Sequence, residues 1–140
     1  MKRKVAIISI SLLLITLFGY TSVMKLGDYY NFRFSLEESP FIGRYAAILV
    51  WAVPASELLI ITLLLLASTR LTGLWASFIL MFLFTAYIAA MLLSGVEIPC
   101  SCGGVLEGMS WPSHLVFNSV FVVLSVVGIF FEHTRKKNLI

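Results

Sequence analysis

The chain has 140 residues, of which 60% are hydrophobic and only 12% are charged, and its mean hydropathy is +1.01. Soluble domains carry roughly 25% charged residues, so this composition excludes a water-soluble domain and indicates a protein that sits in lipid. The basic residues, which leave a net charge of +3, gather toward the two chain ends rather than along one stripe, which argues against nucleic acid as a partner.

Four apolar segments follow one another along the chain, at residues 5–24, 46–68, 74–93 and 113–131. About 20 helical residues, each rising about 1.5 Å, cross the roughly 30 Å hydrocarbon layer. In lipid only a helix satisfies its own backbone, so the Val- and Phe-rich last segment is predicted to be helical too. The sequence therefore predicts one domain over residues 1–140, an all-α integral membrane protein built as a four-transmembrane-helix bundle.

The positions of Lys and Arg predict how this bundle is oriented. With both termini and the short turn "STRLTG" inside, the cytoplasmic side carries more basic residues, namely Lys2, Arg3, Lys4, Arg70, Arg135, Lys136 and Lys137 against Lys25, Arg33 and Arg44 outside. We therefore predict a multi-pass protein of the bacterial inner (cytoplasmic) membrane with both termini in the cytoplasm. The connections 25–45 and 94–112 then face the periplasm or the exterior.

The second of these connections contains "EIPCSCGGVLEG", which holds both cysteines, Cys100 and Cys102. An extended i, i+2 pair lies near or beyond the roughly 6.8 Å limit between α-carbons in a disulfide, so closing the bond requires a tight turn. Gly103 and Gly104 allow the positive φ that such a turn uses. A disulfide between these two cysteines would close a very short ring, so it would add little stability. Strained, exposed disulfides are typically the ones that take part in exchange. The pattern favours a redox-active pair.

Two other interpretations of the cysteines stay open. The pair is a purely structural disulfide if it simply oxidises in an oxidising compartment. It is part of a metal site if His114 and either Glu97 or Glu107 complete a zinc-like ligand set, which is the weakest of the three because zinc ligands are usually spaced Cys-x(2–4)-Cys. Both cysteines are predicted to lie on the outer side of the membrane. A redox pair there has to exchange with outer proteins or with a small redox carrier dissolved in the bilayer. A quinone is the candidate for such a carrier.

His114 and Asn118 begin the last apolar segment and are one helical turn apart on the same face. The positive end of a helix dipole disfavours imidazolium, so His114 is predicted to be neutral and able to accept a proton. The same dipole favours a thiolate brought close to it. The alternative is that His114 is an interfacial residue and Asn118 a hydrogen bonder between helices.

Glu57 lies near the middle of the second apolar segment, just after Pro54. A charged carboxyl at this depth costs a few kcal/mol or more, so Glu57 is predicted to be protonated or paired inside the bundle. It is a candidate proton relay or a polar contact for a carrier's head group, and the alternative is a clamp between helices. Lys25 can approach the outer half of the second segment, but whether it reaches Glu57 is left open.

Five motifs together resemble the MauE/DoxX group of small four-helix membrane proteins, in particular its redox-associated MauE-like branch. They are "YTSVMKL", "SPF", "VPASELLI", "CSCGG" and "SWPSHLVFN", in this order and at this spacing. The resemblance implies a membrane partner for thiol–disulfide chemistry on extracytoplasmic proteins, with Cys100 and Cys102 as the exchanging pair. A looser similarity connects the chain with quinone-reducing DsbB-like and vitamin K epoxide reductase-like bundles, which have a further cysteine pair that this chain lacks.

The sequence thus predicts a membrane thiol–disulfide redox protein, a possible oxidoreductase without a metal. Its Cys-x-Cys connection exchanges disulfides with a thioredoxin-like partner or a thiol client, His114 assists proton transfer, and Glu57, Asn118, Gly103, Gly104 and Lys25 support the site. The main alternative is a non-catalytic subunit of a larger membrane complex whose disulfide shapes a docking loop. A small-molecule carrier that depends on Glu57 is a third hypothesis.

Overall fold

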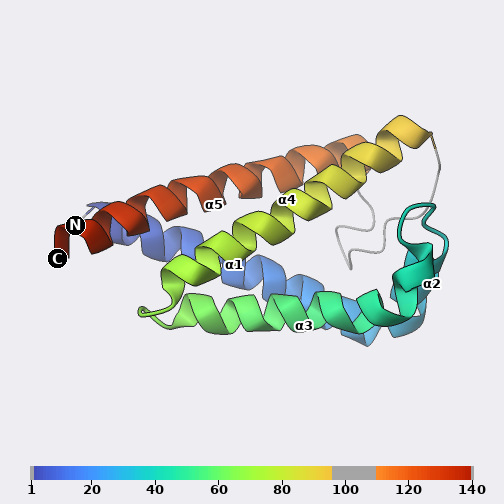
Figure 1. The fold of residues 1–140 in the computed structure, drawn as a ribbon, viewed down its shortest axis with the longest axis horizontal. Helices are drawn as coiled ribbons and strands as arrows, with labels where there is room; N and C mark the ends of the chain where they lie inside the picture. The colour runs from blue at the N-terminus through green and yellow to red at the C-terminus, as the bar shows by residue number, and fades with distance from the viewer. Residues whose placement is uncertain (1, 96–109, 140) are drawn as a thin grey trace.

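The computed structural model describes residues 2–95 and 110–139, and its elements in these ranges are all helices (Figure 1). They are α1 (Lys2–Gly27), α2 (Tyr29–Glu37), the short 3-10 helix η1 (Gly43–Tyr45), α3 (Ala46–Leu65), α4 (Arg70–Ser94) and α5 (Trp111–Leu139). Helices α1, α3 with η1, α4 and α5 are long and apolar enough to cross a membrane. This confirms the predicted all-α bundle of four spans, whereas the side on which the termini lie stays a prediction.

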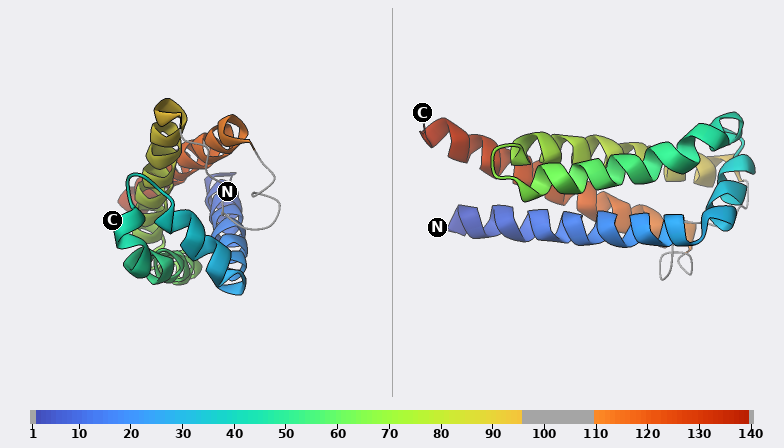
Figure 2. Two further views of the ribbon diagram at one scale, coloured as in Figure 1. Left: turned by 90° about the vertical axis from the view of Figure 1, so that its right-hand side faces the viewer. Right: turned by 90° about the horizontal axis from the view of Figure 1, so that it is seen from below.

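The four long helices form a closed ring, because α1 and α4 each pack against both α3 and α5 (Figures 1 and 2). Successive long helices run in opposite directions, so both termini lie at one end of the bundle, called here the terminal end. Helix α2 lies across the opposite end, called here the α2 end. Helix α4 finishes and α5 starts at the α2 end as well.

The apolar core lies between α1, α3 and α4 and consists of Ile10, Leu14, Phe18, Ile60, Leu64, Leu74 and Met81. Toward the terminal end the helices approach closely at two glycines. A β-carbon on Gly73 would lie 3.0 Å from the backbone nitrogen of Leu64, and one on Gly128 would lie 3.0 Å from Cδ2 of Leu74. Small residues at helix contacts are how membrane bundles gain close packing without a hydrophobic driving force.

The connection predicted at 25–45 is more structured than the sequence indicated. Its first residues continue α1 as far as Gly27, and Tyr29–Glu37 form α2. Helix α2 buries Phe32 and Leu36 against Ala46 and Val50 of α3. Its other face carries the exposed ion pair of Arg33 with Glu37, at 2.8 Å. Since α2 turns an apolar face inward and a charged face outward, it caps the bundle at this end.

Candidate functional site

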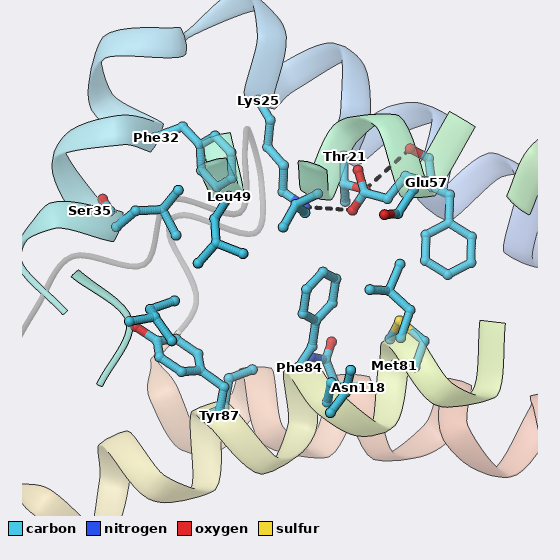
Figure 3. A pocket seen from close by; sticks show the side chains of 18 of the residues that line it. Thr21, Lys25, Phe32, Ser35, Leu49, Glu57, Met81, Phe84, Tyr87 and Asn118 are labelled. Carbon is cyan, nitrogen blue, oxygen red and sulfur yellow. Dashed lines mark hydrogen bonds and ion pairs between the residues drawn. The ribbon is translucent and has the colours of Figure 1, made fainter. Parts of the chain in front are cut away.

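A cavity of about 480 Å³ lies at the α2 end, between the four long helices and α2 (Figure 3). Volumes of roughly 300–1,000 Å³ are typical of small-molecule sites, which are mostly apolar with a few convergent polar groups. Most of the lining here is aliphatic or aromatic, and each of the four long helices contributes to it. The polar groups among the lining residues are Thr21, Lys25, Ser35, Ser56, Glu57, Tyr87, His114 and Asn118.

One wall of the cavity is built around Glu57, which is fully buried in α3. The Lys25 ammonium donates a hydrogen bond to Glu57 Oε1 at 2.6 Å, so the two form an ion pair between α1 and α3. Thr21 Oγ1 donates to the same oxygen at 3.3 Å, and Ser22 Oγ donates to Oε2 at 2.7 Å. The sequence left open whether Lys25 reaches Glu57, and the structure shows that it does.

This geometry follows from the local sequence of α1. Thr21, Ser22 and Lys25 are one to four residues apart in an otherwise apolar stretch, so their side chains leave α1 on one face. Because α1 continues to Gly27, Lys25 is held in the last helical turn and only 6% of it is exposed. A buried ion pair repays its desolvation only with good geometry and further hydrogen bonds, and the two hydroxyls supply these.

Lys25 also faces aromatic rings of the cavity. Its Nζ lies 5.0 Å from the ring centre of Phe84 and 5.7 Å from that of Phe32, both within the range of cation–π attraction. An ammonium has three N–H donors, and the structure gives Lys25 one hydrogen bond among the described residues, to Glu57. Lys25 therefore keeps hydrogen-bonding capacity beyond its ion pair.

The opposite wall comes from α4 and α5, and Figure 3 shows Phe84, Tyr87 and Asn118 across the cavity from Lys25, Thr21 and Glu57. His114 and Asn118 both line the cavity and are only 2% and 4% exposed, as their shared helix face predicts. The start of α5 holds His114 in place: Ser110 comes directly before the helix, and its Oγ accepts a 3.4 Å hydrogen bond from the Ser113 backbone N–H.

Asn118 differs from the other buried polar groups of the cavity. No described residue forms a hydrogen bond with its side-chain amide, although the amide lines the cavity. Buried polar groups nearly always have a partner, so such a group calls for an explanation. Tyr87, in contrast, donates to Ser39 Oγ at 2.9 Å and so ties α4 to the segment after α2.

Cys100, Cys102, Gly103 and Gly104 lie outside the described residues, as do Glu97 and Glu107. The described chain ends at Gly95 before this connection and resumes at Ser110, and these two residues are called here its anchors. Cys100 follows Gly95, the left-handed residue that ends α4, by five positions, and Cys102 precedes Ser110 by eight. Both anchors are at the α2 end, where the cavity lies.

The sequence did not single out several residues that build the site. Thr21 and Ser22 bind the Glu57 carboxylate, and Phe32 and Phe84 face Lys25. Trp111 also lines the cavity. The hydroxyl residues gave a usable signal, since they recur with Lys25 on one face of an apolar helix. The aromatic residues gave none, because Phe is common throughout these spans.

Four apolar helices in a ring, with a buried ion pair and a cavity that all four helices line, define a multi-pass membrane protein of the four-helix class. The family model described as "Methylamine utilisation protein MauE" matches residues 3–131, so the chain belongs to the MauE family. This confirms the MauE part of the resemblance, and the DoxX part stays a prediction. Neither the comparison with curated proteins nor that with solved structures gives a match.

Proposed function

We propose that this protein is a membrane thiol–disulfide redox protein whose Cys100–Cys102 connection exchanges disulfides with an extracytoplasmic thioredoxin-like partner or thiol client. The observation that carries the proposal is the position of the two described residues that flank this connection. Both of its anchors, Gly95 and Ser110, are at the end of the bundle that holds the Lys25–Glu57 pair, His114 and the cavity. Membership of the MauE family agrees with the proposal, because the resemblance to this family implies thiol–disulfide chemistry.

In this proposal one cysteine attacks, or its disulfide is attacked, through a mixed-disulfide intermediate. The thiolate is the reactive form, so a neighbouring base and a positive helix end both favour the reaction. His114 lies in the first turn of α5 and would supply the base, while the first backbone N–H groups of the same helix supply the positive end. The loop lies on the periplasmic or exterior side of the inner membrane, where disulfides persist.

Trapping the mixed disulfide tests this function. With Cys100→Ser or Cys102→Ser, the remaining thiol has no neighbour to resolve the intermediate, so one of the two variants should accumulate a covalent adduct with its partner. The adduct should disappear on reduction and should be absent from the double variant. If neither single variant forms an adduct and the double variant keeps the wild-type phenotype, the thiols do not exchange. The protein is then better described as a non-catalytic subunit with a structural disulfide.

A further inference from the structure

We infer that the cavity at the α2 end is a binding site for a lipid-soluble quinone. The claim that the quinone binds stands on the geometry of the cavity alone. The claim that the bound quinone exchanges electrons with Cys100 and Cys102 rests on the proposed function. The two claims are therefore tested separately.

The position and lining of the cavity select a lipid-soluble ligand. It lies among helices that are apolar enough to cross a membrane, and aliphatic and aromatic side chains make up most of its wall. Such a wall suits a ligand that dissolves in the hydrocarbon layer. The volume of about 480 Å³ is that of a small-molecule site rather than of a single buried water.

The polar groups select a ligand with hydrogen-bonding atoms at two opposite edges. Lys25 comes from α1 on one wall and Asn118 from α5 on the other, and both side chains are more than nine-tenths buried. Lys25 has donor capacity beyond its ion pair, and the Asn118 amide lacks a partner among the described residues. A fatty acid or an alcohol has one polar end, whereas a quinone has two carbonyl oxygens on opposite sides of a flat ring.

The rings and the amide also suit both oxidation states of a quinone. Phe32 and Phe84 line the cavity next to Lys25 and offer flat apolar faces for stacking. An amide is both donor and acceptor, so Asn118 can donate to a quinone carbonyl and accept from a hydroquinone hydroxyl. A hydroquinone hydroxyl oxygen still accepts hydrogen bonds, so the donor Lys25 can contact the ligand in both states as well.

If the proposed function is correct, the cavity gives the thiols a redox partner on their own side of the bundle. The two thiols lose two electrons and two protons and form the S–S bond. The quinone takes up both electrons and both protons, and its two carbonyls become the hydroxyls of a hydroquinone. Run in reverse, the same exchange reduces the disulfide. No second cysteine pair is required, because the quinone itself is the second redox couple.

Binding can be measured through Trp111, which lines the cavity. The other two tryptophans, Trp51 and Trp75, are 59% and 50% exposed, so Trp51→Phe with Trp75→Phe leaves one reporter at the site. The purified protein in lipid nanodiscs is titrated with decylubiquinone, and quenching of Trp111 fluorescence is followed. We expect saturable quenching, whereas decylbenzene, which has a ring and a tail but no carbonyls, should compete poorly.

Asn118→Leu keeps the size of the side chain and removes its hydrogen bonds, so the apparent Kd should rise about tenfold or more. Asn138→Leu is the matched control, because Asn138 is exposed on the same helix at the terminal end and should leave Kd unchanged. Ala52→Phe fills the cavity from α3 without touching its polar groups and should abolish saturable binding. This second variant keeps the test valid if Asn118→Leu fails to fold.

Non-saturable quenching that is equal in all variants would mean that the probe only partitions into lipid, and it would overturn the quinone site. Equal competition by decylbenzene would do the same. If the quinone binds but does not oxidise the reduced thiols, the site stands and the electron exchange is wrong. If the thiols exchange with proteins but no quinone binds, the proposed function stands without this site.

Discussion

Glu57 and Glu132 are both fully buried carboxylates. Glu57 lines the cavity of the α2 end, whereas Glu132 lies near the C-terminal end of α5. Glu132 pairs with Arg135 of its own helix through hydrogen bonds of 2.7 and 3.1 Å, and Arg135 is still 31% exposed. Glu57 pairs with Lys25 of a different helix, and the Lys25 side chain is only 6% exposed. Glu57 also accepts hydrogen bonds from two hydroxyl groups of α1. The Glu132 pair lies within one turn of a single helix, whereas the Glu57 pair connects two helices beside a cavity.

The packing around these two carboxylates differs in the same way. At the terminal end Gly73 and Gly128 bring the helices into direct contact. At the α2 end large side chains and α2 hold the helices around about 480 Å³ of open space. Protein interiors are normally packed without voids of this size, and an unfilled cavity costs stability. The terminal end is therefore closely packed, whereas the α2 end keeps a cavity, as the proposed binding site requires.

The largest effect is expected from removing the carboxylates themselves. Glu57→Leu leaves Lys25 buried without its counterion and should lower the free energy of unfolding by about 3–5 kcal/mol. Glu132→Leu should cost about 1–2 kcal/mol, because the partly exposed Arg135 can turn to water or lipid head groups. SDS titration of the two variants in mixed micelles measures both values, and equal losses would contradict the distinction between the two pairs.

The double variant Lys25→Met/Glu57→Leu sharpens this comparison. Replacing a buried ion pair by apolar residues of similar size is often neutral, so the double variant should recover most of the stability that Glu57→Leu loses. It should nevertheless bind quinone more weakly than the parent, since the donor of one wall is gone. A double variant that stays as unstable as Glu57→Leu would show that the loss is not due to an unpaired Lys25.

The close contacts at the terminal end should give the next largest effect. Gly73→Ala places a β-carbon 3.0–3.1 Å from backbone atoms of Leu63 and Leu64, which cannot move aside, and overpacking of this kind costs about 1–3 kcal/mol. Gly128→Ala meets only the side chains of Leu74 and Ile10 and should cost less. Gly27→Ala, where nothing lies within 4 Å, is the control and should be neutral or stabilising. The same SDS titration ranks the three variants.

The smallest effects are expected at Ser11 and Asn118, two buried polar side chains that form no hydrogen bond with a described residue. Ser11 Oγ is buried in α1 toward the terminal end, and Asn118 faces the cavity. Removing an unpaired buried polar group should leave stability unchanged or raise it by up to about 1 kcal/mol, so Ser11→Ala and Asn118→Leu should look alike in unfolding. Only Asn118→Leu should weaken quinone binding, and a loss in both variants would mean that the binding signal reports a general change in the bundle.

The sequence was sufficient for the fold because lipid leaves few alternatives. Four long apolar segments have to be helices, and short turns make neighbouring helices antiparallel. Helix α2 was not predicted, because Tyr29–Glu37 mixes charged and aromatic residues that are equally typical of an irregular interfacial segment. Its helical state becomes clear only when Phe32 and Leu36 are seen to pack on α3.

The site was predictable residue by residue but not as an arrangement. Glu57, His114, Asn118 and Lys25 stood out because polar groups in apolar helices are rare. The Lys25–Glu57 pair could not be predicted, since it depends on the depth at which α1 and α3 are aligned. The cavity could not be predicted either, because it arises from side chains of five helices and not from any local pattern.

The measurement that tests the central claim most directly is a redox titration of Cys100 and Cys102 in isolated membranes, with thiols trapped by a bulky, membrane-impermeant maleimide. A thiol–disulfide exchange protein should show a reversible midpoint at roughly −120 to −230 mV, where known exchange catalysts lie, and labelling from the outer side only. A bridge that resists reduction below about −300 mV would identify a structural disulfide and contradict the proposed function.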